Sequence, residues 1–302
     1  MLKYLLGAGI AFVVSFLLSL ALRRLSPRLG LVDKPNQRKI HASSQSIGGL
    51  APVGGFLATY FWGGTPSFAF AIGLVIVTLT GLVDDIRGLG AWSKLVLQVL
   101  AALPLVMLME LPSTSFGPEF LLEGKANLIF LVFWIVGITN AYNLIDGLDG
   151  LAGGIALITA AAALMGTQPA TSNLALAGLI GAILAFLLFN SYPAQLFLGD
   201  GGAYFLGFTL AFLTVYSLQT PAGKSAAEWS LIAGGLLVGI PILDTTWAIA
   251  RRVYQSKGVF QSDSNHIHHR LLEGMGHRKS VFVLYVLQIC AVMGGLAYWW
   301  LV

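Results

Sequence analysis

Four polar side chains recur at every third position between two apolar stretches of the chain. They lie in residues 140–154, NAYNLIDGLDGLAGG, and are Asn140, Asn143, Asp146 and Asp149. Residues three apart are neighbours on a helix surface, so we expect these side chains to form one slowly drifting row. Carboxylate and amide oxygens are ligands for Mg²⁺, and acids within membrane segments usually serve a function. A short polar loop is the alternative, but turn formation does not require this spacing.

Two further acidic sites lie at the ends of apolar runs. Asp84 and Asp85 follow the run at residues 67–83, where the dipole of a helix C-terminus disfavours acids. A bound cation or the nearby Lys94 is expected to compensate them, with a solvated helix end as the alternative. Asp200 lies in FLGDGG, where a loop turns into an apolar helix. The N–H groups of a helix start suit a phosphate, and the carboxylate suits its magnesium; an N-capping role is the alternative.

Three histidines lie close together in NHIHHRLL, at His266, His268 and His269, followed by Arg270. A zinc site would need further His or Cys ligands, and the sequence has no second cluster of them. Hydrogen bonding to phosphate oxygens therefore fits better, with an ordinary polar loop as the alternative. Asp244, in PILD, is expected to line a cavity. The residues leave open whether it supports the site or takes part in the chemistry.

The segments that must hold these residues have the composition of a membrane protein. Of the 302 residues, 57% are hydrophobic and 10% are charged, whereas soluble domains are about a quarter charged. We therefore expect an all-α, polytopic membrane protein with a single domain over residues 1–302. The first apolar run, 2–22, is followed by Arg23 and Arg24 without a cleavage site, which predicts a retained span. Cys290 is the only cysteine, which excludes an internal disulfide.

About ten apolar runs are long enough to cross a membrane, since a span needs about 20 residues. They are residues 2–22, 47–63, 67–83, 93–110, 127–145, 150–166, 174–190, 201–217, 229–249 and 280–301. With ten spans, all but three of the 17 Lys and Arg residues fall on one side, and the positive-inside rule makes that side cytoplasmic. Both termini are then periplasmic, and every polar cluster belongs to a cytoplasm-facing active site.

Two connections between these spans have features of their own. The basic stretch 33–41, DKPNQRKIH, either contributes only to the charge asymmetry or binds anionic lipid or nucleotide phosphate. On the outer side, residues 111–126 are expected to form a small hairpin.

These motifs, in this order and on one membrane face, resemble those of the polyprenyl-phosphate N-acetylhexosamine-1-phosphate transferases. The matching stretches are VDKPNQRKIH (32–41), GLVDD (81–85), NAYNLIDGLDGLAGG (140–154), FLGDGGAYFLG (197–207), PILD (241–244) and HIHH (266–269). The pattern His-x-His-His resembles the WecA- and TagO-like branch more than the MraY branch, which has three consecutive histidines. The resemblance implies transfer of a HexNAc-1-phosphate from a UDP-N-acetylhexosamine to undecaprenyl phosphate, with release of UMP, at the bacterial cytoplasmic membrane.

The resemblance also implies roles for individual residues. Mg²⁺, with Mn²⁺ as an alternative, would be bound by Asp200, Asn143 and Asp146. The substrates would be bound by Lys94 at the pyrophosphate, Asp149 at the uracil ring, Asn140 and Arg270. The catalytic set would comprise Asp84, Asp85, His266, His268 and His269. The same resemblance implies a homodimer, membrane lipid as a partner, and no part for nucleic acid.

Two other classes of protein compete with this interpretation. A cation- or proton-coupled transporter would also carry acids in its spans, but near mid-bilayer and open to both sides. The acids here lie at cytoplasmic ends, and the sequence has no evident internal repeat, whereas transporters often contain inverted repeats. A non-catalytic scaffold leaves the acids unexplained. The sequence leaves open which sugar is used, which glycan pathway is served (cell wall or lipopolysaccharide O-antigen), and whether transfer is direct or passes through a phospho-aspartyl intermediate.

Overall fold

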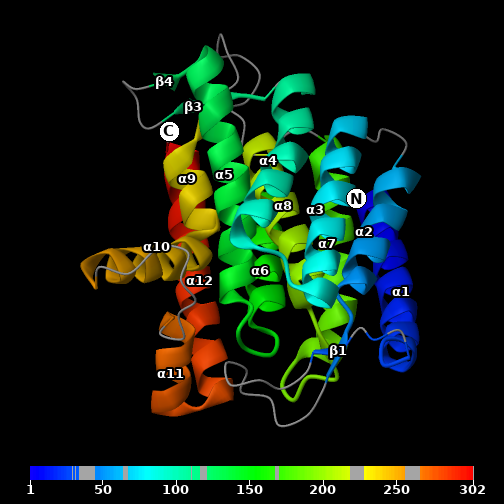
Figure 1. The fold of residues 1–302 in the computed structure, drawn as a ribbon. Coiled ribbons are helices and arrows are strands. Elements are labelled where there is room, and N and C mark those ends of the chain that lie inside the picture. Colours follow the sequence, from blue (N-terminus) through cyan, green and yellow to red (C-terminus); the bar gives the residue numbers. More distant parts are fainter. Residues whose placement is uncertain are drawn as a thin grey trace.

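The computed structural model describes residues 1–28, 30, 32–33, 45–63, 67–109, 111–115, 121–166, 170–217, 228–255 and 266–301. These residues form a helical bundle with two small sheets (Figure 1). Most of the basic stretch 33–41 lies outside the described residues, so neither interpretation of it is tested.

The helices are numbered along the chain. They are α1 (Leu2–Leu25), α2 (Leu50–Trp62), α3 (Phe68–Arg87), α4 (Ala91–Leu108), α5 (Gly124–Ile145), α6 (Leu151–Met165), α7 (Ala170–Asn190), α8 (Gly199–Ser217), α9 (Leu231–Leu237), α10 (Gly239–Tyr254), α11 (Ile267–Met275) and α12 (His277–Leu301).

Helix α8 lies inside the bundle and is buried along almost its whole length (Figure 1). It packs against α3 and α5, while α1, α2 and α7 pack on one another at one edge of the bundle. Helices α9 and α12 pack together on the other side, and α6 lies between, against both α7 and α12 (Figure 1). A helix that meets protein on every side is apolar along most of its surface, and the one charged residue of α8, Asp200, lies in its first turn.

The backbones of α3 and α8 approach each other closely at Gly81. A Cβ atom at this position would lie 2.5 Å from backbone atoms of Asp200 and Gly201, closer than real Cβ contacts. Small residues allow membrane helices to pack in this way. Gly81 therefore brings the acids at the end of α3 next to the acid at the start of α8.

Among the described residues, six helices are long and apolar enough to cross a membrane, namely α1, α3, α4, α5, the part of α7 from Ser172, and α12. The bent pair α9 and α10 makes a seventh if it counts as one span. Helices α2 and α6 have 13 and 15 residues, or about 20 and 23 Å, which is short of the ~30 Å hydrocarbon core. The polytopic, all-α membrane protein is confirmed. Ten spans are not confirmed. The expected spans at α2 and α6 are short helices, the one at α9 and α10 is bent, and the one at α8 is a buried helix that is not among the six.

The two sheets lie at the two ends of the bundle (Figure 1). Strand β2 (Gln45–Ile47) pairs antiparallel with β1 (Val32–Asp33) and parallel with β5 (Leu196–Phe197), just before α8. At the other end, β3 (Ser113–Ser115) pairs antiparallel with β4 (Leu121–Leu122) and parallel with β6 (Glu228–Ser230). The pairing of β3 with β4 confirms the hairpin expected within residues 111–126.

Helices α9 and α10 meet at an angle of 90°. The run 229–249, which we expected to be one span, is therefore broken at Val238. Helix α10 leaves the bundle sideways, and α11 follows near the end where β1 lies (Figure 1). This bend gives Asp244 its position, because the residue lies one turn into the displaced helix.

Candidate active site

The acid pair at the end of α3 lies against the start of α8. The Asp85 carboxylate accepts hydrogen bonds from the backbone N–H groups of Asp200 (2.9 Å) and Gly201 (3.1 Å). The first N–H groups of a helix have no partner within it, and the positive end of the helix dipole favours an anion. Asp85 therefore occupies the helix N-terminus at which the sequence suggested a phosphate.

Asp84 has a different set of partners. Its Oδ2 atom forms an ion pair with Lys94 Nζ at 2.7 Å, and its Oδ1 atom accepts the N–H of Leu89 at 2.6 Å. Lys94 lies in the first turn of α4, and the short connection after α3 brings the two side chains together. The sequence suggested that either a bound cation or Lys94 balances the negative charge of the acid pair. At Asp84, Lys94 does so. About a quarter of the Lys94 side chain (26%) stays exposed.

Asp200 and Asn143 meet where α5 passes the start of α8. The Asn143 Nδ2 atom donates to Asp200 Oδ1 at 2.8 Å, and Asp200 also interacts with Asp84 and Asp85. Carboxyl groups from α3 and α8 therefore converge with an amide from α5. Like charges at short range repel, and oxygen donors of these types are the ligands of Mg²⁺. The donor set fits a hard divalent cation.

The row of polar residues in 140–154 is helical only in its first half. Asn140 and Asn143 lie on α5, but Asp146 is the C-cap residue of this helix, and Asp149 lies in the turn that follows. Gly150, with a φ of 78°, precedes α6, and this left-handed conformation suits glycine. The expectation of one continuous helical row is wrong beyond Asn143, because the glycine-rich turn ends the helix.

The first and last members of the row bind neighbouring segments. Asn140 and Gln98 of α4 exchange hydrogen bonds, with Asn140 Nδ2 at 2.6 Å from Gln98 Oε1 and Gln98 Nε2 at 3.3 Å from Asn140 Oδ1. The Asp149 Oδ2 atom accepts the N–H of Ala194 at 3.0 Å, and its backbone oxygen accepts from His277 Nε2 at 3.1 Å. These contacts tie the central motif to α4, to α12 and to the segment before β5.

Asp244 holds the start of the histidine motif. Its Oδ2 atom accepts from His266 Nδ1 at 2.8 Å, and its Oδ1 atom accepts the N–H of Ile267 at 2.7 Å. His266 is the N-cap residue of α11. Asp244 is 1% exposed, so this pair of bonds is shielded from water. A carboxylate on one ring nitrogen fixes the orientation of an imidazole, and the contacts therefore favour a supporting role for Asp244.

His268 lies against the turn of the central motif. A Cβ atom at Gly147 would overlap the His268 ring at Nε2. His268 is 1% exposed, and its Nδ1 atom lies 3.5 Å from Asp244 Oδ2. Within the part of the chain that the structure describes, neither ring nitrogen makes a well-formed hydrogen bond. The His269 ring lies 4.3 Å from it, whereas Arg270 is exposed. His268 thus contacts the 146–149 turn, as a shared site requires.

Asp244, His266 and His268 also have donor atoms within 4.8 Å of one another, which is close enough for a shared metal ion. The sequence had argued against zinc for want of a further ligand, and Asp244 supplies one. The 2.8 Å separation of His266 Nδ1 and Asp244 Oδ2 is that of a hydrogen bond, and the other Asp244 oxygen is engaged by a backbone N–H. We therefore assign this trio to orientation of the histidines.

Sequence reasoning missed Gln98, Ala194 and His277. Their partners in the central motif are 42, 45 and 128 residues away along the chain, so no local pattern marks them. Asp244 was recognisable from the sequence as an acid in an apolar run. Its contact with the histidines could not be predicted, because it depends on the bend between α9 and α10.

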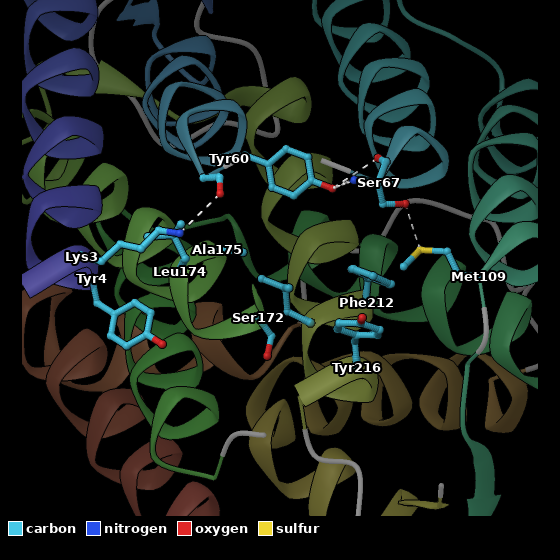
Figure 2. Close-up of a pocket in the computed structure, with 12 residues that line it drawn as sticks. Lys3, Tyr4, Tyr60, Ser67, Met109, Ser172, Leu174, Ala175, Phe212 and Tyr216 are labelled. Carbon is cyan, nitrogen blue, oxygen red and sulfur yellow. Dashed lines mark hydrogen bonds between the residues drawn. The ribbon is translucent and has the colours of Figure 1, made fainter. Parts of the chain in front are cut away.

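A separate cavity of about 370 Å³ lies at the opposite ends of α3 and α8 (Figure 2). Ser67 precedes α3, and Tyr216 lies near the end of α8. The Tyr60 hydroxyl accepts the N–H of Ser67 at 2.7 Å, and the Ser67 hydroxyl donates to Met109 Sδ at 3.3 Å. None of the acids, amides or histidines described above lines this cavity, so it is separate from the candidate active site.

Comparisons with known proteins agree with the geometry. Residues 67–218 match the model of glycosyl transferase family 4. The chain is 37% identical over 295 residues to the probable undecaprenyl-phosphate N-acetylglucosaminyl 1-phosphate transferase of Bacillus subtilis, covering 92% of this chain and 81% of that protein. It is 32% identical over 316 residues to the decaprenyl-phosphate N-acetylglucosaminephosphotransferase of Mycobacterium tuberculosis, covering 91% and 78%.

A third relative has a lower sequence identity but is covered to a similar extent. The undecaprenyl-phosphate alpha-N-acetylglucosaminyl 1-phosphate transferase of Thermotoga maritima is 29% identical over 276 residues, covering 90% of this chain and 83% of that protein. The family match contains Asp84, Asp85, Asn143, Asp149 and Asp200. The chain belongs to glycosyl transferase family 4 and, within it, to the polyprenyl-phosphate N-acetylhexosamine-1-phosphate transferases.

Proposed function

We propose that the protein transfers an N-acetylhexosamine 1-phosphate from a UDP-sugar to undecaprenyl phosphate and releases UMP. The relatives are named for N-acetylglucosamine, which is therefore the first sugar to test. The product would start a cell-surface glycan on its lipid carrier. No observation favours the transporter that the sequence left as an alternative.

The observation that carries the proposal is the meeting of α3, α5 and α8 at one end of an apolar bundle. There Asp84, Asp200 and Asn143 lie together with the Lys94 ammonium. Phosphoryl transfer requires cationic groups and a divalent metal ion at the phosphoryl oxygens. Attack at the anomeric carbon would instead require acids flanking a sugar ring. The mixture of acids, amide and ammonium supports the first chemistry.

Mg²⁺ would be held by Asp200 and Asn143, with Asp146 at the end of α5 as a third ligand. The fit rests on the donor set, since Asp200 receives a hydrogen bond from a neutral amide while two other acids lie close to it. When bound, Mg²⁺ supplies charge neutralisation at the pyrophosphate and stabilises the departing UMP. Mn²⁺ prefers similar oxygen ligands and is the natural substitute.

The chain's own groups bind and orient the two substrates. The Lys94 ammonium has three N–H donors, so it would keep its bond to Asp84 and donate another to an oxygen of the pyrophosphate. The histidines at the 146–149 turn would donate to other oxygens. An oxygen of the lipid phosphate attacks the sugar-side phosphorus, a new P–O bond forms, and the bond to the UMP phosphate breaks. UMP leaves with the electron pair of that bond. The nucleophile is already anionic, because the second pKa of a phosphate monoester is near 6.

Direct attack fits the geometry better than a phospho-aspartyl intermediate. Both oxygens of Asp84 are engaged, by Lys94 and by the N–H of Leu89. Both oxygens of Asp85 accept N–H groups from the start of α8. Either acid would have to give up these bonds before it could attack phosphorus.

We further propose that the site faces the cytoplasm of a bacterial inner membrane and that both termini are periplasmic. The support is the charge asymmetry of the chain, which the positive-inside rule relates to orientation. In a Cys290→Ser background, Tyr254→Cys, 92% exposed, should react with an impermeant thiol reagent only in inside-out vesicles. Glu123→Cys should react only in right-side-out vesicles, and reaction of both from the same side would reject the topology.

The proposed reaction is tested by the identity of the released nucleotide. Purified protein with UDP-N-acetylglucosamine, undecaprenyl phosphate and Mg²⁺ should release UMP and form a pyrophosphate-linked lipid. Labelled UMP should exchange back into UDP-sugar in the presence of that product. Release of UDP with a monophosphate-linked lipid would overturn the mechanism, and a panel of other UDP-N-acetylhexosamines would define the sugar.

A further inference from the structure

One side chain from α12 forms hydrogen bonds to both sides of the 90° break between α9 and α10. At a break, backbone groups lose their partners within the helix and need others. The Gln288 Nε2 atom donates to the backbone oxygen of Leu237, the last residue of α9, at 2.7 Å. Its Oε1 atom accepts the N–H of Ile240, in the first turn of α10, at 3.0 Å. One amide therefore binds both sides of the bend.

The Gln288 amide is completely buried, and both its nitrogen and its oxygen form hydrogen bonds. Gln288 is 0% exposed, and its Nε2 atom also donates to Thr159 Oγ1 at 3.0 Å. The Thr159 hydroxyl in turn donates to the backbone oxygen of Leu237 at 2.8 Å and lies 3.3 Å from the Tyr142 hydroxyl. Buried polar networks in which every member has a partner specify a single arrangement.

The network connects the bend with both halves of the site. Ile240 lies one helical turn before Asp244, which holds His266 and the N–H of Ile267. Tyr142 is adjacent to Asn143, which binds Asp200. A change in the direction of α10 would move Asp244 and with it the histidines, relative to the 146–149 turn.

We propose that Gln288 is a positioning residue, which fixes the direction of α10 so that Asp244 presents the histidines to the turn of the central motif. The proposal rests on the proposed phosphoryl transfer for its kinetic test, but not for its structural one. Within the described residues, the hydrogen bonds of Gln288 go to Leu237, Ile240 and Thr159 and to none of the acids or histidines, so its effect on the histidines passes through α10.

The kinetic test is Gln288→Met, which keeps the shape of the side chain and removes its hydrogen bonds. We expect kcat for UMP release to fall about tenfold, the lower end of the range for groups that orient catalytic residues, with little change in KM for the UDP-sugar. Combined with Asp244→Asn, it should reduce kcat little beyond the larger single effect, since both act on the same histidines. An unchanged kcat, or losses that multiply, would overturn the proposal.

Asn127→Leu is the matched control. Asn127 is also buried and uses its amide to bind Pro112 and Thr114, but at the end of the bundle that holds β3. If Gln288 contributes only to stability, the two variants should lower the thermal midpoint and kcat alike. The proposal requires a loss of kcat in Gln288→Met that Asn127→Leu does not reproduce.

The structural test needs no activity. In a Cys290→Ser background, spin labels at Tyr254→Cys on α10 and Phe282→Cys on α12, both exposed, report the direction of α10. Gln288→Met should broaden or shift the distance distribution, and Asn127→Leu should leave it unchanged. An unaltered distribution in Gln288→Met rejects the role at the bend. Absence of UMP release from the unmodified protein would instead reject the proposed function.

Discussion

Asp200 and Asp244 are both acids near the end of an apolar bundle, but their surroundings differ. Asp200 receives a hydrogen bond from the neutral amide of Asn143 and lies near Asp84 and Asp85. Asp244 is bound by His266 and by a backbone N–H. The first acid therefore has two like charges beside it, whereas the oxygens of the second accept hydrogen bonds from an imidazole and a backbone N–H.

This difference assigns the two regions different tasks. An acid whose neighbours are acids is stabilised by a proton or by a nearby cation, and a bound divalent cation meets this need. An acid whose oxygens are taken by an imidazole and an N–H holds those groups in place. We therefore expect the Asp200 region to bind and the Asp244 region to orient, and the variants below separate these tasks.

The largest effect is expected from Asp200→Asn. Loss of a metal-binding carboxylate should lower kcat by about a hundredfold or more and raise the Mg²⁺ concentration needed for half-maximal rate. The measurement is UMP release over a titration of Mg²⁺. Glu123→Gln, an exposed acid remote from the site, should leave both quantities unchanged. Turnover like that of the unmodified protein would reject the metal site.

A smaller effect is expected from Asp244→Asn. The variant keeps an oxygen for the N–H of Ile267 but loses the carboxylate that orients His266, so kcat should fall about tenfold. The Mg²⁺ dependence should not change, because the Asp200 region is intact. A shift in the Mg²⁺ dependence as large as that of Asp200→Asn would erase the distinction between the two regions.

The contact between the regions is tested by Gly147→Ala. The added Cβ atom would overlap the His268 ring, and overpacking of this kind costs about 1–3 kcal/mol. Gly137→Ala is the control, since no atom lies within 4 Å of a Cβ there and Gly to Ala in a helix stabilises by up to about 1 kcal/mol. Thermal midpoints and kcat should fall only for Gly147→Ala. Equal behaviour of the two variants would place His268 elsewhere.

The smallest effect is expected at Asn140, which the sequence assigned to substrate binding and the structure pairs with Gln98. Asn140→Leu and Gln98→Met should each destabilise by about 1 kcal/mol, and the double variant should add little. KM for the UDP-sugar should change alike in both single variants. A larger rise in KM for Asn140→Leu alone would restore its assignment to the substrate.

The sequence predicts the residue types of the site better than their arrangement. The acids, amides and histidines carry strong local signals because such groups are costly in apolar segments. Their convergence depends on contacts that no local pattern contains, such as Gly81 against the start of α8 and Asp85 on the N–H of Asp200. The sequence therefore predicts which motifs form the site, but not how they contact one another.

The same limit applies to the fold. Apolar runs predict a membrane bundle because burial in lipid requires them, but a run of similar length can form a straight span, a short helix or a bent pair. The break at Val238 depends on Gln288, 51 residues from Leu237. The glycines after Asn143 indicate a turn. The three-residue spacing of the polar side chains indicates a continuous helix instead, and we followed the spacing.

The hydrogen bond from the N–H of Asp200 to Asp85 joins residues 115 positions apart. During synthesis at about 5–20 residues per second, the ribosome adds α8 roughly 6 to 23 s after the end of α3. Through that interval α3 is available for insertion into the bilayer, while the backbone donors that its terminal acid will bind do not yet exist. A nascent or prematurely terminated chain that stops before α8 thus lacks Asp200 and should be inactive. Competence for phosphoryl transfer therefore cannot arise before two-thirds of the polypeptide has been made, and it also awaits the histidines at 266–269.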